Sequence, residues 1–125
     1  MRTPLRVLGA TLALTACGAQ SSGPPAVAYG GTLSVGSPQT HRFRTHCGIE
    51  WLGRFNDIDW RAETPLPPGQ PDVPASWVRH VDSSERVVLR IELVDPQRVT
   101  ARPVDGADAS VVAFVPTSEP APGCD

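Results

Sequence analysis

Apolar and polar residues alternate in short segments along the chain from residue 32 onwards, a period of two that is typical of β-strands with one buried face. The longest such segment covers residues 86–94, where Val87 and Leu89 face one way and Arg90 and Glu92 face the other. Further strands are predicted wherever the pattern returns. They cover residues 32–35, 39–47, 49–55, 60–62, 77–82, 98–104 and 110–115.

Residues 46–63 hold the densest aromatic part of the chain and predict a β-hairpin. Alternation places Ile49, Trp51, Gly53 and Phe55 on the inner face, and Trp60 resumes this face after the polar sequence NDID at 56–59. Asparagine and aspartate tolerate a positive φ, so they can form the tight turn. We therefore expect the hairpin to supply Trp51 and Trp60 to the core.

Prolines and long apolar runs divide the remainder of the chain. Five prolines within residues 64–76 exclude regular structure there, because proline lacks an amide donor and restricts the preceding residue. The apolar run at 111–115 predicts a central strand with both faces covered, which Pro116 should end. No helical period appears after residue 31. These features predict an all-β domain at 32–125, a small antiparallel β-sandwich or barrel with one disulfide.

Residues 1–16 resemble a removable export signal. Arg2 and Arg6 precede an apolar stretch that is too short to span a bilayer, which takes roughly 20 apolar residues. The stretch ends in Leu-Thr-Ala-Cys17, which resembles the lipobox of bacterial lipoproteins and implies that Cys17 carries lipid. The alternative is an ordinary secretory signal that leaves Cys17 as a free thiol or a disulfide partner.

Residues 17–31 have the small, polar and proline-containing composition of a flexible tether. With lipid on Cys17, this tether would hold the domain at the extracytoplasmic face of the cell membrane, since two acyl chains suffice for stable anchoring.

Charge and cysteine content narrow the expected partners. The net charge is −2, and removal of Arg2 and Arg6 with the signal changes it to −4. No basic cluster suited to phosphate binding is present, which excludes nucleic acid as an expected partner. With Cys17 lipidated, Cys47 and Cys124 remain, and such a pair in an exported chain predicts one disulfide.

The sequences HCGIEWLGRF, DWRAE and VVAFVP, followed by the final cysteine, resemble a family of small exported proteins and lipoproteins of actinobacteria without an assigned function. The resemblance covers roughly residues 46–124. Its motifs are structural in character, so it supports the β-fold and the disulfide and implies no activity. The NDID turn departs from the glycine-containing turn expected in this family.

Candidate chemistry is sparse. His41, His46 and His80 could ligate a metal only if they converged with a free thiolate. Asp57 and Asp59 lack the third ligand and the glycine of a calcium loop, even with Glu63 nearby. We therefore expect no metal and no cofactor.

Two remaining groups could serve catalysis or binding. Ser83 and Ser84 lie in a short predicted turn, outside a nucleophile elbow. Trp77 and His80 are candidate ligand contacts, although a small domain more often uses tryptophans to fill its core. The sequence thus favours a non-enzymatic envelope lipoprotein that binds a protein or glycan. The alternative is a small envelope hydrolase or ligand-binding factor with an aromatic-lined pocket.

Overall fold

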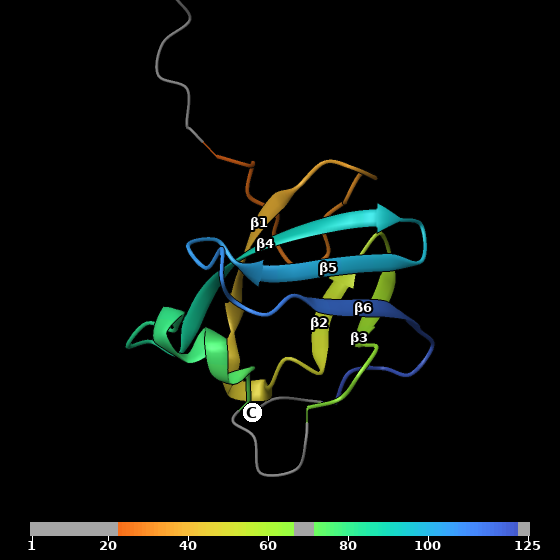
Figure 1. Cartoon of the computed structure of the whole chain (residues 1–125). Helices are drawn as coiled ribbons and strands as arrows, with labels where there is room; N and C mark the ends of the chain where they lie inside the picture. Colours follow the sequence, from red (N-terminus) through yellow and green to blue (C-terminus); the bar gives the residue numbers. More distant parts are fainter. Residues whose placement is uncertain (1–22, 67–71, 123–125) are drawn as a thin grey trace, which may run out of the picture.

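The fold is one six-stranded antiparallel sheet that curls into a nearly closed barrel (Figure 1). The computed structural model describes residues 23–66 and 72–122. The strands follow one another across the sheet in the order β1-β4-β5-β6-β3-β2. Their bounds are β1 Gln39–Arg44, β2 Trp51–Phe55, β3 Ile58–Ala62, β4 Arg86–Asp95, β5 Arg98–Pro103 and β6 Val112–Thr117. Two short 3-10 helices complete the elements, η1 at Thr45–Cys47 and η2 at Ala75–His80.

The β2–β3 hairpin confirms the predicted turn. Asn56 and Asp57 have φ values of 56° and 59°, and positive φ at both central residues defines a type I′ turn, whose twist matches that of the flanking strands. Neither position needs glycine, because asparagine and aspartate tolerate this conformation. The Trp60 indole N–H donates to the Phe55 carbonyl at 3.1 Å, which satisfies its polar atom inside the core.

A β-bulge in β2 makes part of the predicted inner face wrong. The pairing register shifts between Trp51 and Gly53, so Leu52 turns inward and is only 2% exposed. Trp51 is consequently displaced to the surface, where the Arg61 guanidinium lies 5.2 Å from its ring centre. The hairpin therefore supplies one core tryptophan, Trp60, instead of two.

One predicted strand is replaced by a 3-10 helix, and another is shortened by one. Residues 77–82 were expected to be extended, but η2 winds over this segment after Pro74 and buries Trp77 completely. The Trp77 indole N–H donates to the Ser110 carbonyl at 2.6 Å, which holds η2 against the loop that precedes β6. The predicted strand at 39–47 likewise ends at Arg44, where η1 begins.

The core lies inside the barrel and is built from the inward residues of all six strands together with the side chains of η2 and the loops. Its largest fully buried members are Trp60, Trp77, Phe55, Phe114, Ile49, Leu89, Ile91, Val99 and Pro103. Strand β6 has the predicted inner position between β5 and β3. It continues through Pro116 to Thr117, and its other apolar side chains are half-buried rather than covered on both faces.

The segment at residues 25–33 closes one end of the gap between the two outer strands, β1 and β2. Val27 N–H donates to the Thr40 carbonyl, and Thr40 N–H donates to the Pro25 carbonyl. On the other side, Gly30 N–H donates to the Arg54 carbonyl at 2.7 Å. The end of the predicted tether is therefore part of the folded domain. We call the gap between β1 and β2 the seam.

The strand expected at 32–35 is reduced to a single bridge between Val35 and Leu93. The predicted signal at 1–16, Cys17 and Cys124 lie outside the described residues. No helix in the described parts is long and apolar enough to cross a membrane.

Candidate ligand-binding face

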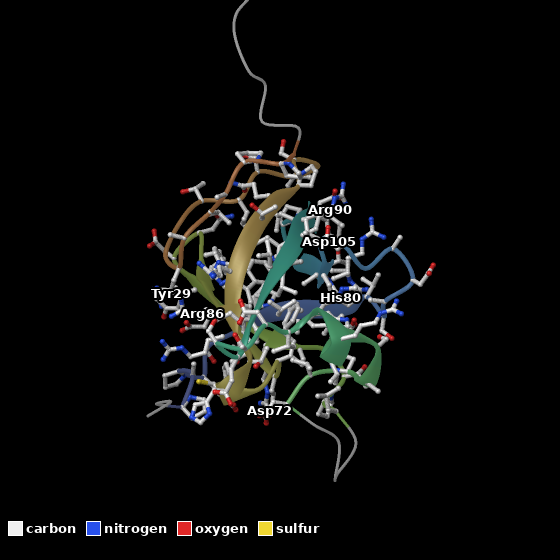
Figure 2. The ribbon with its side chains drawn as sticks, turned by 90° about the vertical axis from the view of Figure 1, so that its left-hand side faces the viewer. Tyr29, Asp72, His80, Arg86, Arg90 and Asp105 are labelled. Carbon is white, nitrogen blue, oxygen red and sulfur yellow. The ribbon has the colours of Figure 1, made fainter. Side chains whose placement is uncertain are left out.

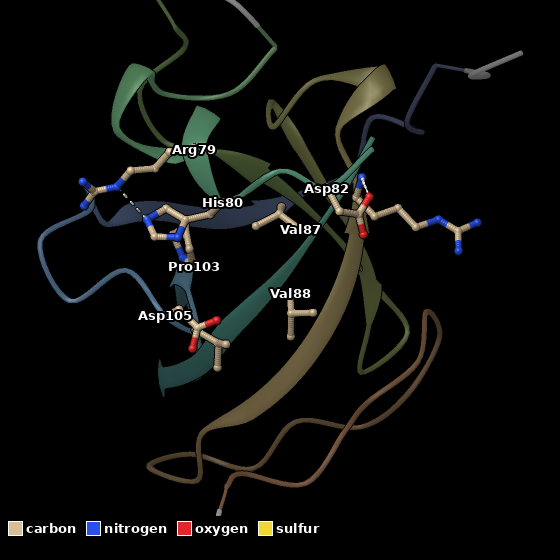
Figure 3. A pocket seen from close by; sticks show the side chains of 9 residues that line it. Arg79, His80, Asp82, Val87, Val88, Pro103 and Asp105 are labelled. Carbon is tan, nitrogen blue, oxygen red and sulfur yellow. Dashed lines mark hydrogen bonds between the residues drawn. The ribbon is translucent and has the colours of Figure 1, made fainter. Parts of the chain in front are cut away.

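A hollow of about 370 Å³ lies on the outside of the barrel, where the end of η2 meets β4 and the end of β5 (Figure 3). We call it the His80 hollow. It mixes arginine, histidine and carboxylate side chains with valines. Its lining residues are Arg79, His80, Asp82, Arg86, Val87, Val88, Pro103, Val104 and Asp105.

His80 is fixed in this hollow by its neighbours. The Arg79 Nε–H donates to His80 Nε2 at 3.2 Å, so this ring nitrogen acts as an acceptor. Gly106 packs closely behind the ring, since a Cβ at this position would lie 3.0 Å from His80 Nε2 and 2.9 Å from the Ala109 Cβ. The loop after β5 thus supports the imidazole, and a side chain at Gly106 would crowd the ring, Ala109 and Pro103.

Asp82 is committed to the turn before β4. Its Oδ1 accepts from the Ser84 hydroxyl at 2.6 Å, from the Ser84 N–H at 2.8 Å and from the Arg86 N–H at 3.1 Å. These bonds, the Ser84 hydroxyl first, lower the pKa of Asp82 below its usual range and keep it ionised. The Ser84 hydroxyl is a donor that orders the turn, which is not the arrangement of an activated nucleophile.

The two predicted ligand contacts, Trp77 and His80, lie in different environments. His80 lines the hollow, whereas Trp77 is 0% exposed and its indole is used internally. Trp77 therefore belongs to the core. The pattern of apolar residues could not separate these roles, because it predicted a strand where η2 turns Trp77 inward.

A second, more apolar hollow of about 600 Å³ adjoins the first. It is lined by residues 26–29 and 40–42 together with Val88, and we call it the Tyr29 hollow. Val88 lines both hollows, which therefore meet on the outer surface of β4. Figure 2 shows this side of the molecule, with Tyr29, Arg86, His80 and Asp105 spread across it.

Apolar side chains are exposed along this face. Tyr29 is 66% exposed, and Val88 and Val104 are 43% and 40% exposed. Besides His80, the sequence holds one further signal for this surface, because Val88 directly follows the inward Val87 and so takes an outward position of β4. Tyr29 gave no signal, because it lies in the predicted tether.

The metal hypotheses find no support among the described residues, which hold no cluster of three metal-ligating side chains. His41 is buried in β1, His46 lies in η1 within 3.9 Å of Glu85, and His80 ends η2. For calcium, Asp59 pairs with Arg54 at 3.3 Å and Glu63 pairs with Arg98 at 2.7 Å. These acids therefore neutralise arginines and do not converge with Asp57.

Comparison with known proteins gives no match: no family model, no curated protein and no solved structure is significantly similar to this chain.

Proposed function

We propose that this protein is a cell-envelope lipoprotein whose barrel domain binds an extracytoplasmic protein or glycan. The binding surface is the face formed by the His80 and Tyr29 hollows. The observation that carries the proposal is the meeting of these hollows at Val88, beside exposed Tyr29 and Val104. Contiguous apolar exposure rimmed by polar residues marks interaction sites on soluble domains.

The chemistry of the face favours binding over hydrolysis. The described residues that line the His80 hollow include no serine, threonine, cysteine or lysine that could act as a nucleophile. Its carboxylate at Asp82 serves the turn, and the hydroxyl of Ser84 is bonded to that carboxylate. The competing proposal of a small envelope hydrolase rests on His80 and the nearby acids alone.

Anchoring through Cys17 is proposed from the lipobox-like sequence. In this proposal, diacylglycerol is attached to the Cys17 sulfur and the signal at 1–16 is removed. Cys17→Ala should abolish incorporation of labelled fatty acid in the producing cells. Labelling that persists in this variant would overturn the anchor.

The Cys47–Cys124 disulfide is proposed from the cysteine count and from the course of the chain. Ala121 and Pro122 line the same hollow as Cys47, so the tail passes near η1 only two residues before Cys124. Non-reducing peptide mapping of exported protein should find these cysteines joined, and free thiols at both would refute the pairing.

Photo-crosslinking on intact cells tests the binding face. A photoreactive amino acid at Val88 should capture a partner, whereas the same group at Val111 serves as a control, since Val111 is 59% exposed and lines neither hollow. The proposal fails if Val88 gives no adduct, or if both positions capture the same products equally.

A further inference from the structure

We propose that the seam between β1 and β2 binds an extended acidic peptide segment of a partner protein, which adds to β1 as a further strand. This inference rests on the proposed binding function and names the kind of partner. Addition of a strand to an open sheet edge is a general mode of peptide recognition, in which main-chain bonds give affinity and side-chain contacts give specificity.

Beyond Thr40, the seam side of β1 has no backbone partner in the part of the chain that the structure describes. β1 pairs with β4 on one side only, and β2 pairs only with β3. Alternate residues of a strand point their backbone N–H and C=O groups to the same side. The backbone groups of Arg42 and Arg44 therefore face the seam, as those of Thr40 do. Thr40 is bonded there by residues 25–27, but no described residue bonds the seam-facing groups of Arg42 and Arg44.

The chain itself shows that this edge accepts an added segment. Ala26 forms a parallel bridge with Thr40, and both backbone groups of Thr40 are used by Pro25 and Val27. The segment then crosses to β2, where Gly30 bonds the Arg54 carbonyl. It thus closes one end of the seam, and beyond Thr40 no described residue bonds the seam-facing backbone of β1.

An apolar hollow of about 290 Å³ lies at this part of the seam, and Ala121 and Pro122 of the tail form one of its borders. Buried Phe43 and Leu52 line it from the two outer strands, and Tyr29 and Trp51 line it as more exposed aromatic residues. Every second side chain of an added strand would point toward this apolar interior. The inward positions of the peptide should therefore be apolar.

The charges that line the hollow favour acidic residues at the outward positions of the peptide. Among the described residues that line it, Arg42 and Arg44 are the only permanently charged ones, and none is acidic. Both arginines are exposed, and the Arg42 side chain approaches Asp82 only to 3.9 Å. Acidic side chains at alternate positions of the peptide would pair with them, whereas basic ones would be repelled.

The test uses the full chain in detergent and a short capped peptide of alternating valine and glutamate. We expect saturable binding by titration calorimetry, together with slower hydrogen exchange at the Arg42 amide. Two control peptides separate the contribution of charge from that of main-chain hydrogen bonds. One replaces glutamate by lysine, and the other keeps glutamate but carries N-methyl groups on alternate amides. Each control should bind at least about tenfold more weakly than the glutamate peptide, a loss of about 1.4 kcal/mol in binding free energy.

Matched protein variants locate the site. Arg42→Glu should weaken binding of the glutamate peptide at least about tenfold and favour the lysine peptide. Arg102→Glu on β5 makes the same charge change away from the seam and should leave binding unchanged. Both side chains are at the surface, and circular dichroism checks that each variant folds.

Several results would overturn the inference. One is the absence of binding at millimolar peptide, and another is equal binding of the N-methylated peptide. A third is concentration-dependent self-association of the chain that protects the Arg42 amide without peptide, which would assign the seam to a second copy. If the peptide does not bind but Val88 still gives a crosslink, only the seam proposal is refuted. If the peptide binds but Val88 gives no crosslink, only the proposed binding face is refuted.

Discussion

Asn56 joins the hairpin turn to the segment that closes the seam, and its replacement should measure how firmly that segment is held. Its Oδ1 accepts from the Leu33 N–H at 2.7 Å, and its Nδ2 donates to the Leu33 carbonyl at 3.0 Å. The same residue has a φ of 56° in the type I′ turn. The Asn56 side chain thus satisfies both backbone groups of Leu33, while the Asn56 backbone has a conformation that most residues avoid.

The expected cost follows from these two roles. Asn56→Gly keeps the turn conformation but removes two hydrogen bonds, each with a net contribution of about 1 kcal/mol, so the free energy of unfolding should fall by about 2 kcal/mol. Asn56→Ala removes the same bonds and adds a left-handed penalty of about 1 kcal/mol. Urea unfolding followed by tryptophan fluorescence checks both values, because Trp60 and Trp77 are completely buried.

Asn56→Asp serves as the matched comparison. It keeps the acceptor for the Leu33 N–H but places a carboxylate oxygen against the Leu33 carbonyl, so its stability should improve at acid pH relative to the original chain. Hydrogen exchange at the Leu33 amide should quicken in the glycine variant and much less in the aspartate variant. Loss of less than about 0.5 kcal/mol in the glycine variant would refute the view that Asn56 holds the segment.

Three further outcomes are expected. Burial lowers the pKa of His41, only partly opposed by its contact with the Val27 carbonyl, so the unfolded chain binds the proton more readily. Stability should therefore be full above the ordinary histidine pKa and fall as the pH drops below it; urea midpoints from pH 8 to 5 measure this. Trp77→Phe should cost about 1–3 kcal/mol, because the Ser110 carbonyl loses its donor, as thermal unfolding can show. Cys47→Ser should lower stability by about 2–5 kcal/mol if Cys47 and Cys124 are joined, as urea unfolding can measure.

Each outcome has a control. His41→Gln should flatten the pH dependence in that range, and an unchanged slope would assign the effect to another group. Ser76→Ala removes two other bonds at Ser110, since Ser76 Oγ donates to the Ser110 hydroxyl and accepts from the Ser110 N–H. This variant separates loss of the indole bond from general loosening of the loop. Cys124→Ser should cost the same as Cys47→Ser, and unequal costs would contradict a shared disulfide.

The regular part of the fold was predictable because its signal is local. Alternation at 86–94 and 98–104 located β4 and β5 to within one residue at each end. The NDID sequence located the hairpin turn, because the conformational tolerance of asparagine and aspartate is a property of the residues themselves.

The errors arise where distant parts of the chain decide the structure. The bulge at Leu52 reverses the facing of Trp51, and alternation cannot reveal an inserted residue. Residues 25–31 have the composition of a linker, but their backbone is bonded by strands that follow them in the sequence. Trp77 lies in η2 and its indole bonds the Ser110 carbonyl, a partner far along the chain that the local pattern does not describe.

The candidate face was even less predictable. The sequence singled out His80, which lines a hollow. The Tyr29 hollow is formed by residues 26–29 and 40–42 and by Val88, which meet only after the sheet has closed. Seam and hollow both depend on the order of strands, and alternation alone does not determine that order.

Under the proposed anchoring, the firm attachment of residues 25–31 would also set how the domain stands on a membrane. With Cys17 anchored as proposed, eight residue steps separate the lipid from Pro25, and a fully extended chain covers at most about 29 Å over that distance. The barrel end where the chain enters, near Thr40, would thus stay close to the lipid headgroups. The opposite end, with η1 and η2, would point outward (Figure 1). A partner would then approach the seam from the side, parallel to the bilayer.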